Sequence, residues 1–473
     1  MPQLCRHIPD ASRRSPRFAV TGALVLALTL SACAPGAPYG MPQFPFLSGY
    51  KAAKPGAPVL LSNTEWWRGF QDRQLDHLMQ LALVQNLSIA AARERVIAAR
   101  AASRSLADPF ALNTTLQSRI SDTGDTTQTR NTGELGLSWM LDPFGQRLSQ
   151  QKAAIARIDA AAAQTDAARL LVLFNLGNAY VDLRYLQRLL HLRQQEIVTR
   201  RKTLSLARQM VENSAGTQLD LTRATARLSD VEAQIPSLQA QIRGQINQIA
   251  VLTGHAPGQL GLDLSTGGGQ PVSSLSPQVG IPADLLRNRP DIRVAERLYY
   301  AAVAETGAAK AALYPRLSLS GAITLGAGGR RDAYFGPALS LPVFPGNAAR
   351  GTVDRAESEA RLAHTTWKAT VLDAILEVEN ALLEYQASRT ARTAAERSVT
   401  LYTQARSMVD TLITNGDATV DDLFDADQSL TSATNTLAET RRQQGRTFIA
   451  LNVRLGSGSG AGLQTAMAEP KTP

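Results

Sequence analysis

Two stretches of this 473-residue chain run for more than sixty positions with almost no helix-breaking residue. Residues 146–215 contain no proline and one glycine, Gly177, and residues 352–415 contain neither. Alanine, leucine, arginine and glutamine dominate the first, and these are strong helix formers. At 1.5 Å per residue, each predicted helix is roughly 100 Å long. Helices of that length need lateral partners, and we expect return helices over 219–252 and 420–455.

Four short segments change from a helical to an alternating pattern. In the first, Phe110, Leu112, Thr114 and Leu116 alternate with more polar neighbours, which is typical of a strand with one apolar face. We predict strands at about 110–120, 133–141, 316–326 and 333–342, paired as two hairpins, with 121–132 as a polar loop. The fold class is therefore mainly α with β.

The order helix, strand, strand, long helix, shorter helix occurs twice. Landmarks recur at a nearly constant interval: Gly254 precedes Gly456 by 202 positions, and Thr217 precedes Thr419 by the same number. A duplication explains this spacing. We divide the chain into a first repeat over 75–254, a linker over 255–282, a second repeat over 283–456 and a flexible tail over 457–473.

The N-terminus has the features of a secretory signal. Three arginines precede an uncharged apolar run that ends in Leu30-Ser31-Ala32-Cys33. The run is too short to span a bilayer as a helix, and its end resembles a bacterial lipobox. We predict a signal peptide over 1–32, lipidation of Cys33, and a Pro/Gly/Ala-rich tether over 33–74. Ala34 in place of Asp implies, within the lipoprotein class, transport to the outer membrane.

Strand number constrains the assembly. Strands of about ten residues match the length of a tilted membrane strand, but one chain supplies four, and the smallest membrane barrels have about eight. Three copies would supply twelve. The alternative is a lipid-anchored coiled-coil scaffold in which the strands form an ordinary small sheet.

Several motifs resemble one family closely. They are Trp66-Trp67 with Phe70, the run from Gly280 to Arg293 (GIPADLLRNRPDIR), Ala311 to Leu319 (AALYPRLSL), Trp139 to Gly145 and Leu341 to Phe344. Together they resemble the TolC-like outer-membrane efflux family, and best its lipoprotein (NodT-type) branch. The resemblance covers the chain from Cys33 to Gly456.

The resemblance implies a homotrimer with a twelve-stranded barrel in outer-membrane lipid, a periplasmic α-helical barrel and a mixed equatorial domain. The implied partners are a periplasmic membrane-fusion adaptor and an inner-membrane pump of the resistance-nodulation-division type. The implied function is a passive exit duct for drugs or other toxic small molecules. A duct for protein secretion is the alternative within the family.

The turn after the second long helix carries the candidate gate. Asp422 and Asp425 share a helix face, and three copies would place them in carboxylate rings at the narrow end of a tunnel. They align with aspartates that constrict the periplasmic entrance in the family. The competing interpretation is that Thr419 caps the helix and Asp422 complements its dipole. Asp220 occupies the matching turn of the first repeat.

The same turns are the predicted adaptor-contacting tips, at Gly216, Thr217, Gly416 and Thr419. Ser214 stands where the family often has glycine, and Ala418 where some members carry arginine, so the closed-state contacts of the family do not transfer directly. The predicted membrane-facing residues are Leu112, Leu116, Leu137, Trp139, Leu319 and Phe335, with Leu135, Leu317, Ile323 and Leu339 on the same faces.

No catalytic or metal-binding pattern is present in the sequence. The five histidines are scattered, and there is no HExxH, CxxC or Walker motif. An envelope hydrolase would need a nucleophile and base that the sequence does not suggest, so we predict no enzyme, no cofactor and no metal. The formal charge of +9 is spread along the chain without a basic block interleaved with aromatics, which argues against nucleic-acid binding.

Overall fold

The computed structural model describes residues 40, 42–45, 49–52, 65–106, 108–122, 127–214, 216–265, 268–273, 283, 285–326, 329, 331–340, 346–415 and 417–459. Cys33 and Gly416 lie outside these residues. The chain divides into two compact units. The strand unit contains Ala99–Arg157 and Leu298–His364, and the helical unit contains Pro42–Ala98, Ile158–Arg297 and the chain from Thr365 onward.

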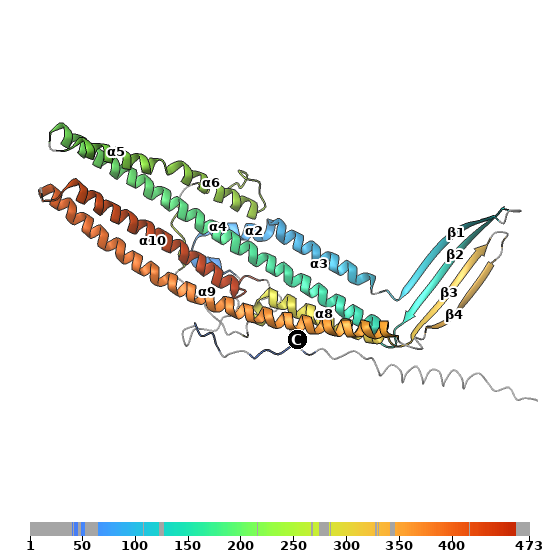
Figure 1. Ribbon diagram of the computed structural model, residues 1–473. Helices are drawn as coiled ribbons and strands as arrows, with labels where there is room; N and C mark the ends of the chain where they lie inside the picture. The colour runs from blue at the N-terminus through green and yellow to red at the C-terminus, as the bar shows by residue number, and fades with distance from the viewer. Residues whose placement is uncertain are drawn as a thin grey trace, which may run out of the picture. The chain divides into compact units, whose positions relative to one another are not determined.

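The strand unit contains a four-stranded antiparallel sheet in the order β1-β2-β3-β4 (Figure 1). Its strands are β1 (Phe110–Asp122), β2 (Thr127–Leu141), β3 (Arg316–Gly326) and β4 (Arg331–Ser340). The predicted polar loop over 121–132 is wrong for most of its length, because β1 and β2 extend into it. The threonines at 127, 129 and 132 suit strands, and the backbone pairing continues as far as Asp122 with Thr127.

Small residues join the helices of the strand unit. Ala153 and Ala156 of α4 (Gln146–Glu212) pack on Ala301 and Ala304 of α8 (Pro290–Ala311). The absence of longer side chains lets these backbones approach closely. On the other side of α8, the Thr306 hydroxyl donates to the Ala356 carbonyl of α9 (Asn347–Asn415) at 3.1 Å.

The helical unit is built around two helical hairpins. In one, α4 is followed by α5 (Gln218–Glu232) and α6 (Ile235–Leu252), and in the other α9 is followed by α10 (Val420–Arg454). α4 and α9 have 67 and 69 residues. In Figure 1 each long helix lies beside the helix that follows its turn.

The core of the helical unit lies where the two hairpins meet the N-terminal helices. Trp66 and Trp67 of η1 (Trp66–Phe70) are buried together with Tyr180, Trp367 and Phe448. Trp66 contacts Phe448 edge-to-face, with ring centroids 6.3 Å apart. α4 approaches this core at Gly177, where an added Cβ would lie 3.1 Å from Ile449 Cδ1.

Two helices that the sequence predicts as continuous are divided in the structure. The return helix expected over 219–252 is broken between α5 and α6, because Pro236 lacks an N–H and its ring clashes with the preceding turn. The helix expected to start at Leu75 is two helices, α2 (Arg73–Gln85) and α3 (Leu87–Ser105), separated at Asn86. The Asn86 side chain accepts from the Ser88 and Ile89 amides and so caps α3.

The ends of the long helices also differ from the prediction. α4 stops at Glu212 instead of 215, and α9 starts at Asn347 instead of 352, with Gly351 inside its first turns. Glycine inside a helix costs about 1 kcal/mol relative to alanine. That cost is small compared with the packing of a 69-residue helix, so Gly351 does not delay its start.

Candidate functional site

One face of the sheet is apolar across all four strands. The register places Leu112 opposite Leu137, Leu135 opposite Ile323, and Leu317 opposite Leu339. Directly opposed residues in antiparallel strands share a face, so the apolar positions of the two hairpins merge into one surface. The surface also includes Phe110, Leu116, Ile120, Trp139, Leu319, Leu325 and Phe335.

This apolar face is solvent-exposed within the single chain. Leu112 is 70% exposed, Leu116 85% and Phe335 69%. Trp139 and Leu319 are half-buried, since each lies between neighbouring strands, and Trp139 stacks on Phe110 at 5.5 Å. Contiguous exposed apolar surface of this kind marks an interaction site with lipid or protein.

The opposite face of the sheet is polar. Asn113, Gln117 and Arg119 of β1 lie on it, and Asn113 pairs with Gly136 while Thr115 pairs with Glu134. β3 contributes Ser318, Ser320 and Thr324. The two faces of the sheet therefore differ in polarity, as the alternation of apolar and polar residues in the sequence predicts.

A glycine opposite an aromatic shapes the apolar face. Gly321 pairs with Phe335 across β3 and β4, and a Cβ at Gly321 would lie 2.8 Å from the Phe335 ring. The ring therefore lies over the glycine and covers backbone that would otherwise be exposed. Phe335 is among the predicted membrane-facing residues, but its pairing with Gly321 was not predicted.

The helix tips are closed by two equivalent capping boxes. In α10 the Asp422 amide donates to Thr419 Oγ1 at 3.2 Å, and Asp422 Oδ2 accepts from the Thr419 amide at 2.8 Å and hydroxyl at 2.7 Å. In α5 Thr217 and Asp220 make the same three hydrogen bonds at 3.2, 3.2 and 2.6 Å. The capping interpretation of Thr419 and Asp422 is thus part of the structure.

These hydrogen bonds change the acidity of both aspartates. Hydrogen bonds from the Thr419 hydroxyl and amide lower the pKa of Asp422 below its usual value of 3.8. The same donors on Thr217 lower the pKa of Asp220. Both carboxylates are therefore held in the charged form at neutral pH, and capping does not remove their charge from the tips.

Gly216 closes the first turn. Its amide donates to the Met210 carbonyl at 3.0 Å, and an added Cβ would lie 3.0 Å from Met210 Cβ. The preceding Ser214 has a φ of 58°, a left-handed conformation that glycine adopts more readily. Ser214 therefore adopts the backbone conformation that would favour the glycine often found at this position in the family.

Asp425 lies in a different environment from Asp422. It is exposed and lines a cavity of about 450 Å³ with Arg227 and Asp230 of α5, Arg193 and Arg200 of α4, and Phe424. Asp422 and Asp220 do not line this cavity. The structure thus places Asp425 beside arginines of neighbouring helices, whereas the other two predicted gate residues are engaged with their caps.

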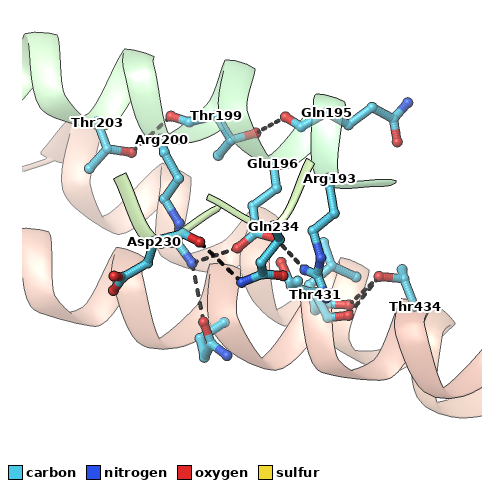
Figure 2. A network of polar contacts seen from close by, with 12 residues as sticks. Arg193, Gln195, Glu196, Thr199, Arg200, Thr203, Asp230, Gln234, Thr431 and Thr434 are labelled. Atoms are coloured by element: carbon cyan, nitrogen blue, oxygen red, sulfur yellow. Dashed lines mark hydrogen bonds and ion pairs between the residues drawn. The ribbon is translucent and has the colours of Figure 1, made fainter. Parts of the chain in front are cut away.

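A buried arginine network below the tips joins three helices (Figure 2). Arg200 of α4 is 5% exposed and donates to Glu196 at 3.3 Å and to Gln428 of α10 at 3.2 Å. Arg227 of α5 lies 4.0 Å from the centroid of the Phe424 ring, a cation–π contact. This network was not predicted, although Arg193, Glu196 and Arg200 are spaced so that they share one helix face.

The N-terminal segment is fastened to α9. Glu379 accepts hydrogen bonds from the Lys51 amide at 2.7 Å and the Ala52 amide at 2.9 Å, and Gln386 donates to the Ala52 carbonyl at 2.6 Å. Tyr50 is buried, and Phe44 packs edge-to-face on Trp367. Within the predicted tether, the described residues 44–45 and 49–52 therefore form a strap on α9.

Arg289 of the GIPADLLRNRPDIR run links four parts of the helical unit. It pairs with Asp291 at 2.6 Å and Glu377 of α9 at 2.8 Å, and donates to the carbonyl of Arg454, the last residue of α10, at 3.1 Å. Arg289 is also the single residue between α7 (Leu285–Asn288) and α8. The motif therefore has a structural role, and it also starts α8 with Pro290 and places Asp291 in the first turn of that helix.

Among the described residues, no three His, Cys, Asp or Glu side chains form a group that could hold a metal ion. In the same part of the chain, no helix combines the length and the apolar composition that crossing a membrane requires.

Comparison with known proteins identifies the family. Residues 78–255 and 281–457 match the family described as outer membrane efflux protein, once per sequence repeat. Nodulation protein T of Rhizobium leguminosarum bv. trifolii is 34% identical over 449 residues, covering 91% of this chain and 96% of that protein. Outer membrane protein OprJ of Pseudomonas aeruginosa is 30% identical, covering 78% and 81%. The solved structure of the outer-membrane channel OprN superposes with a TM-score of 0.80 at 28% identity, covering 90% and 99%. The fold is TolC-like, as predicted, and the chain belongs to the outer membrane efflux protein family.

Proposed function

We propose that three copies of this chain assemble into an exit duct that carries toxic small molecules through the outer membrane. As a member of its family, the chain is the outer-membrane channel component of an efflux pump. The observation that carries the trimeric duct is the exposed apolar face that runs across all four strands. Transfer of that face from water into lipid is favourable, because its apolar side chains leave water.

The sheet edges require further strands. β1 and β4 are the outer strands of the four-stranded sheet, and unpaired backbone groups in lipid cost several kcal/mol each. Pairing β4 of one copy with β1 of the next removes both edges if the ring closes. Three copies give twelve strands, with the apolar faces outward and the polar faces toward the lumen.

The strap supports lipidation of Cys33 on the same membrane. Eleven residues separate Cys33 from Phe44, a reach of at most about 36 to 40 Å. Phe44 packs on Trp367, which lies twenty residues into α9, or about 30 Å from its start. The chain from Cys33 to Phe44 is therefore long enough to cover the length of α9 that precedes Trp367.

The gate proposed for the trimer consists of carboxylates at the tips. Asp422 and Asp220 remain charged because their caps lower their pKa values, and Asp425 is exposed one turn further along α10. Three-fold repetition would bring like charges together, which favours cation binding and opposes closure unless a cation is present.

The tips would also receive a periplasmic adaptor, fed by an inner-membrane pump of the resistance-nodulation-division type. Gly216, Thr217, Gly416 and Thr419 belong to the two turns. Thr217 and Thr419 are exposed, so an adaptor can contact them without disturbing the helices below.

Reconstitution tests the proposal. Native mass spectrometry of the purified full chain should give a trimer, and the protein should conduct ions in planar bilayers. Replacing Asp422 and Asp425 together by alanine should raise conductance or weaken block by divalent cations. Asp417→Ala with Asp421→Ala removes the same number of charges beside the same turn and serves as the control. A monomer without conductance would support the scaffold interpretation and refute the duct. Conductance with no effect of the double replacement would remove only the gate.

A further inference from the structure

A cleft of about 920 Å³ in the helical unit carries strong positive charge. It lies between α4, α6, α10 and the segment around 265–270. This volume is within the range of small-molecule binding sites. None of the proposed channel surfaces includes it, and the inference drawn from it does not depend on the proposed function.

Basic side chains from three helices line the cleft. Arg188 and His191 come from α4, Arg243 from α6 and Arg441 from α10, and none of the residues that line it is Asp or Glu. The spacing of Arg188 and His191 puts both on one face of α4. Gln187, Gln194, Gln239, Gln270 and Ser265 add neutral hydrogen-bonding groups.

Carboxylates of the described residues neutralise the basic groups of the cleft only in part, through an exposed pair at Arg441. Within the described residues, no ion pair involves Arg188 or Arg243, whereas Arg200 and Arg442 are paired with Glu196 and Asp182. Arg441 pairs with Glu396 at 3.2 Å, but both side chains are more than a third exposed. Such surface pairs contribute little free energy and exchange readily.

The wall opposite the helices is held in place. Gln187 Nε2 donates to the Leu264 carbonyl at 2.6 Å, and Gln270 Nε2 donates to the Ala438 carbonyl at 2.7 Å. Gly268 packs so close to Arg184 that an added Cβ would lie 2.9 Å from the guanidinium carbon. The segment is therefore fixed to α4 and α10 on both sides of the cleft, and a ligand would meet a preformed site.

We propose that this cleft binds a small anion that carries two or more carboxylate or phosphate groups. Guanidinium groups bind such groups through paired hydrogen bonds. Because the arginines come from three helices, an anion with a single charged group would engage only part of the site. Gln194 and Gln239 would recognise hydroxyl or carbonyl groups between the charges.

Isothermal titration calorimetry on the purified full chain tests this site, with citrate and pyrophosphate as probes and acetate and glycerol as controls. Citrate, pyrophosphate or both should bind saturably, with a dissociation constant in the millimolar range or below, and acetate and glycerol should not. Arg188→Gln with Arg243→Gln should weaken binding by about tenfold or more, equivalent to about 1.4 kcal/mol. Arg441→Gln alone should also weaken it, which covers the case in which the double variant does not fold.

The matched control is Arg93→Gln with Arg95→Gln, which removes two exposed charges from α3. Binding should be unchanged in this variant. The proposal is refuted if the wild-type chain shows no saturable binding of either probe. Equal weakening by the cleft and α3 variants would also refute it, because net charge alone would then explain the effect.

Discussion

Gly254 and Gly456 occupy the same structural position in the two repeats. Their φ angles are 82° and 79°, and in each case an added Cβ would lie 2.5 Å from a backbone carbonyl oxygen, that of Gln85 for Gly254 and that of Asn288 for Gly456. Gln85 ends α2 and Asn288 ends α7. The duplication inferred from a spacing of 202 residues therefore extends to individual backbone contacts.

Alanine at either glycine should destabilise the helical unit. Gly258 is the matched control, since its φ is 84° but nothing lies within 4 Å of its Cβ position. Gly258→Ala carries only the left-handed backbone cost of about 1–2 kcal/mol, whereas Gly254→Ala and Gly456→Ala add an overlap costing about 1–3 kcal/mol more. Thermal unfolding followed by circular dichroism should show the lower midpoint for those two. Equal midpoints for all three variants would contradict this account.

The capping box should make the first turn of α10 sensitive to acid. The pKa of Asp422 is lowered in the folded chain by hydrogen bonds from Thr419, so its stabilising effect is present above the usual Asp value of 3.8 and is lost as the pH falls through the lowered pKa. The protection factors of the backbone amides at 420–425 against hydrogen exchange should therefore decrease in that pH range.

Thr419→Val removes the hydroxyl donor and should raise the pKa of Asp422 toward its usual value, so that protection is lost at a higher pH. Thr217→Val is the control, because it acts on Asp220 in the other repeat. If Thr217→Val moved the α10 transition as much as Thr419→Val, the two caps would not be independent and the prediction would fail.

Arg289 should not be replaceable by lysine. Burial opposes its charge, but the hydrogen bonds that Arg289 donates to the carboxylates of Asp291 and Glu377 outweigh this and raise its pKa. Lysine cannot make the paired contact with Asp291 and reach Glu377 and the Arg454 carbonyl as well. We expect Arg289→Lys to cost about 1–3 kcal/mol, discounted because both carboxylates are partly exposed.

Arg355→Lys is the control for that measurement. Arg355 pairs with Glu359 on the exposed surface of α9, and exposed pairs contribute about 0–1 kcal/mol. Urea unfolding of the two variants should therefore differ clearly. A near-zero effect of Arg289→Lys would mean that its contacts are not needed for stability.

The two faces of β1 should respond differently to a charge. Leu112→Arg places a guanidinium on the apolar face and should cost about 2–4 kcal/mol if that position lies near the middle of a bilayer. Asn113→Arg, one residue along, adds the same charge to the polar face and should be tolerated. The measurement is the fraction of chain recovered as a folded oligomer in outer-membrane preparations. Similar recovery of both variants would argue against a lipid-facing surface.

The sequence predicted the elements whose residues form long, regular patterns. The two long helices, the four strands and their common apolar parity follow from helix-forming residues without breakers and from strict alternation, as at Leu135, Leu137 and Trp139. The bounds were less predictable. Polar Thr127 and Thr129 gave no sign that β2 extends toward the turn, because such residues suit loops and exposed strands equally well.

The sites divided in the same way. Thr419 and Asp422 have local capping spacing, so their geometry could be read from sequence. The cavity around Asp425 and the contacts of Arg200 with Gln428, or of Glu379 with Ala52, depend on residues up to 327 positions apart. Sequence spacing carries no information on such pairs. The gate and adaptor residues themselves stay predictions, as does lipidation of Cys33.

The fastening of residues 51 and 52 to Glu379 and Gln386 has a mechanical consequence. Any pull on an acyl chain attached upstream would be borne first by the packing of Phe44 on Trp367 of α9, and then by the burial of Tyr50 and by these hydrogen bonds. All of these contacts precede the tryptophans of η1 along the chain. Lateral drag from the bilayer would thus enter the protein through the body of a 69-residue helix before it reached η1.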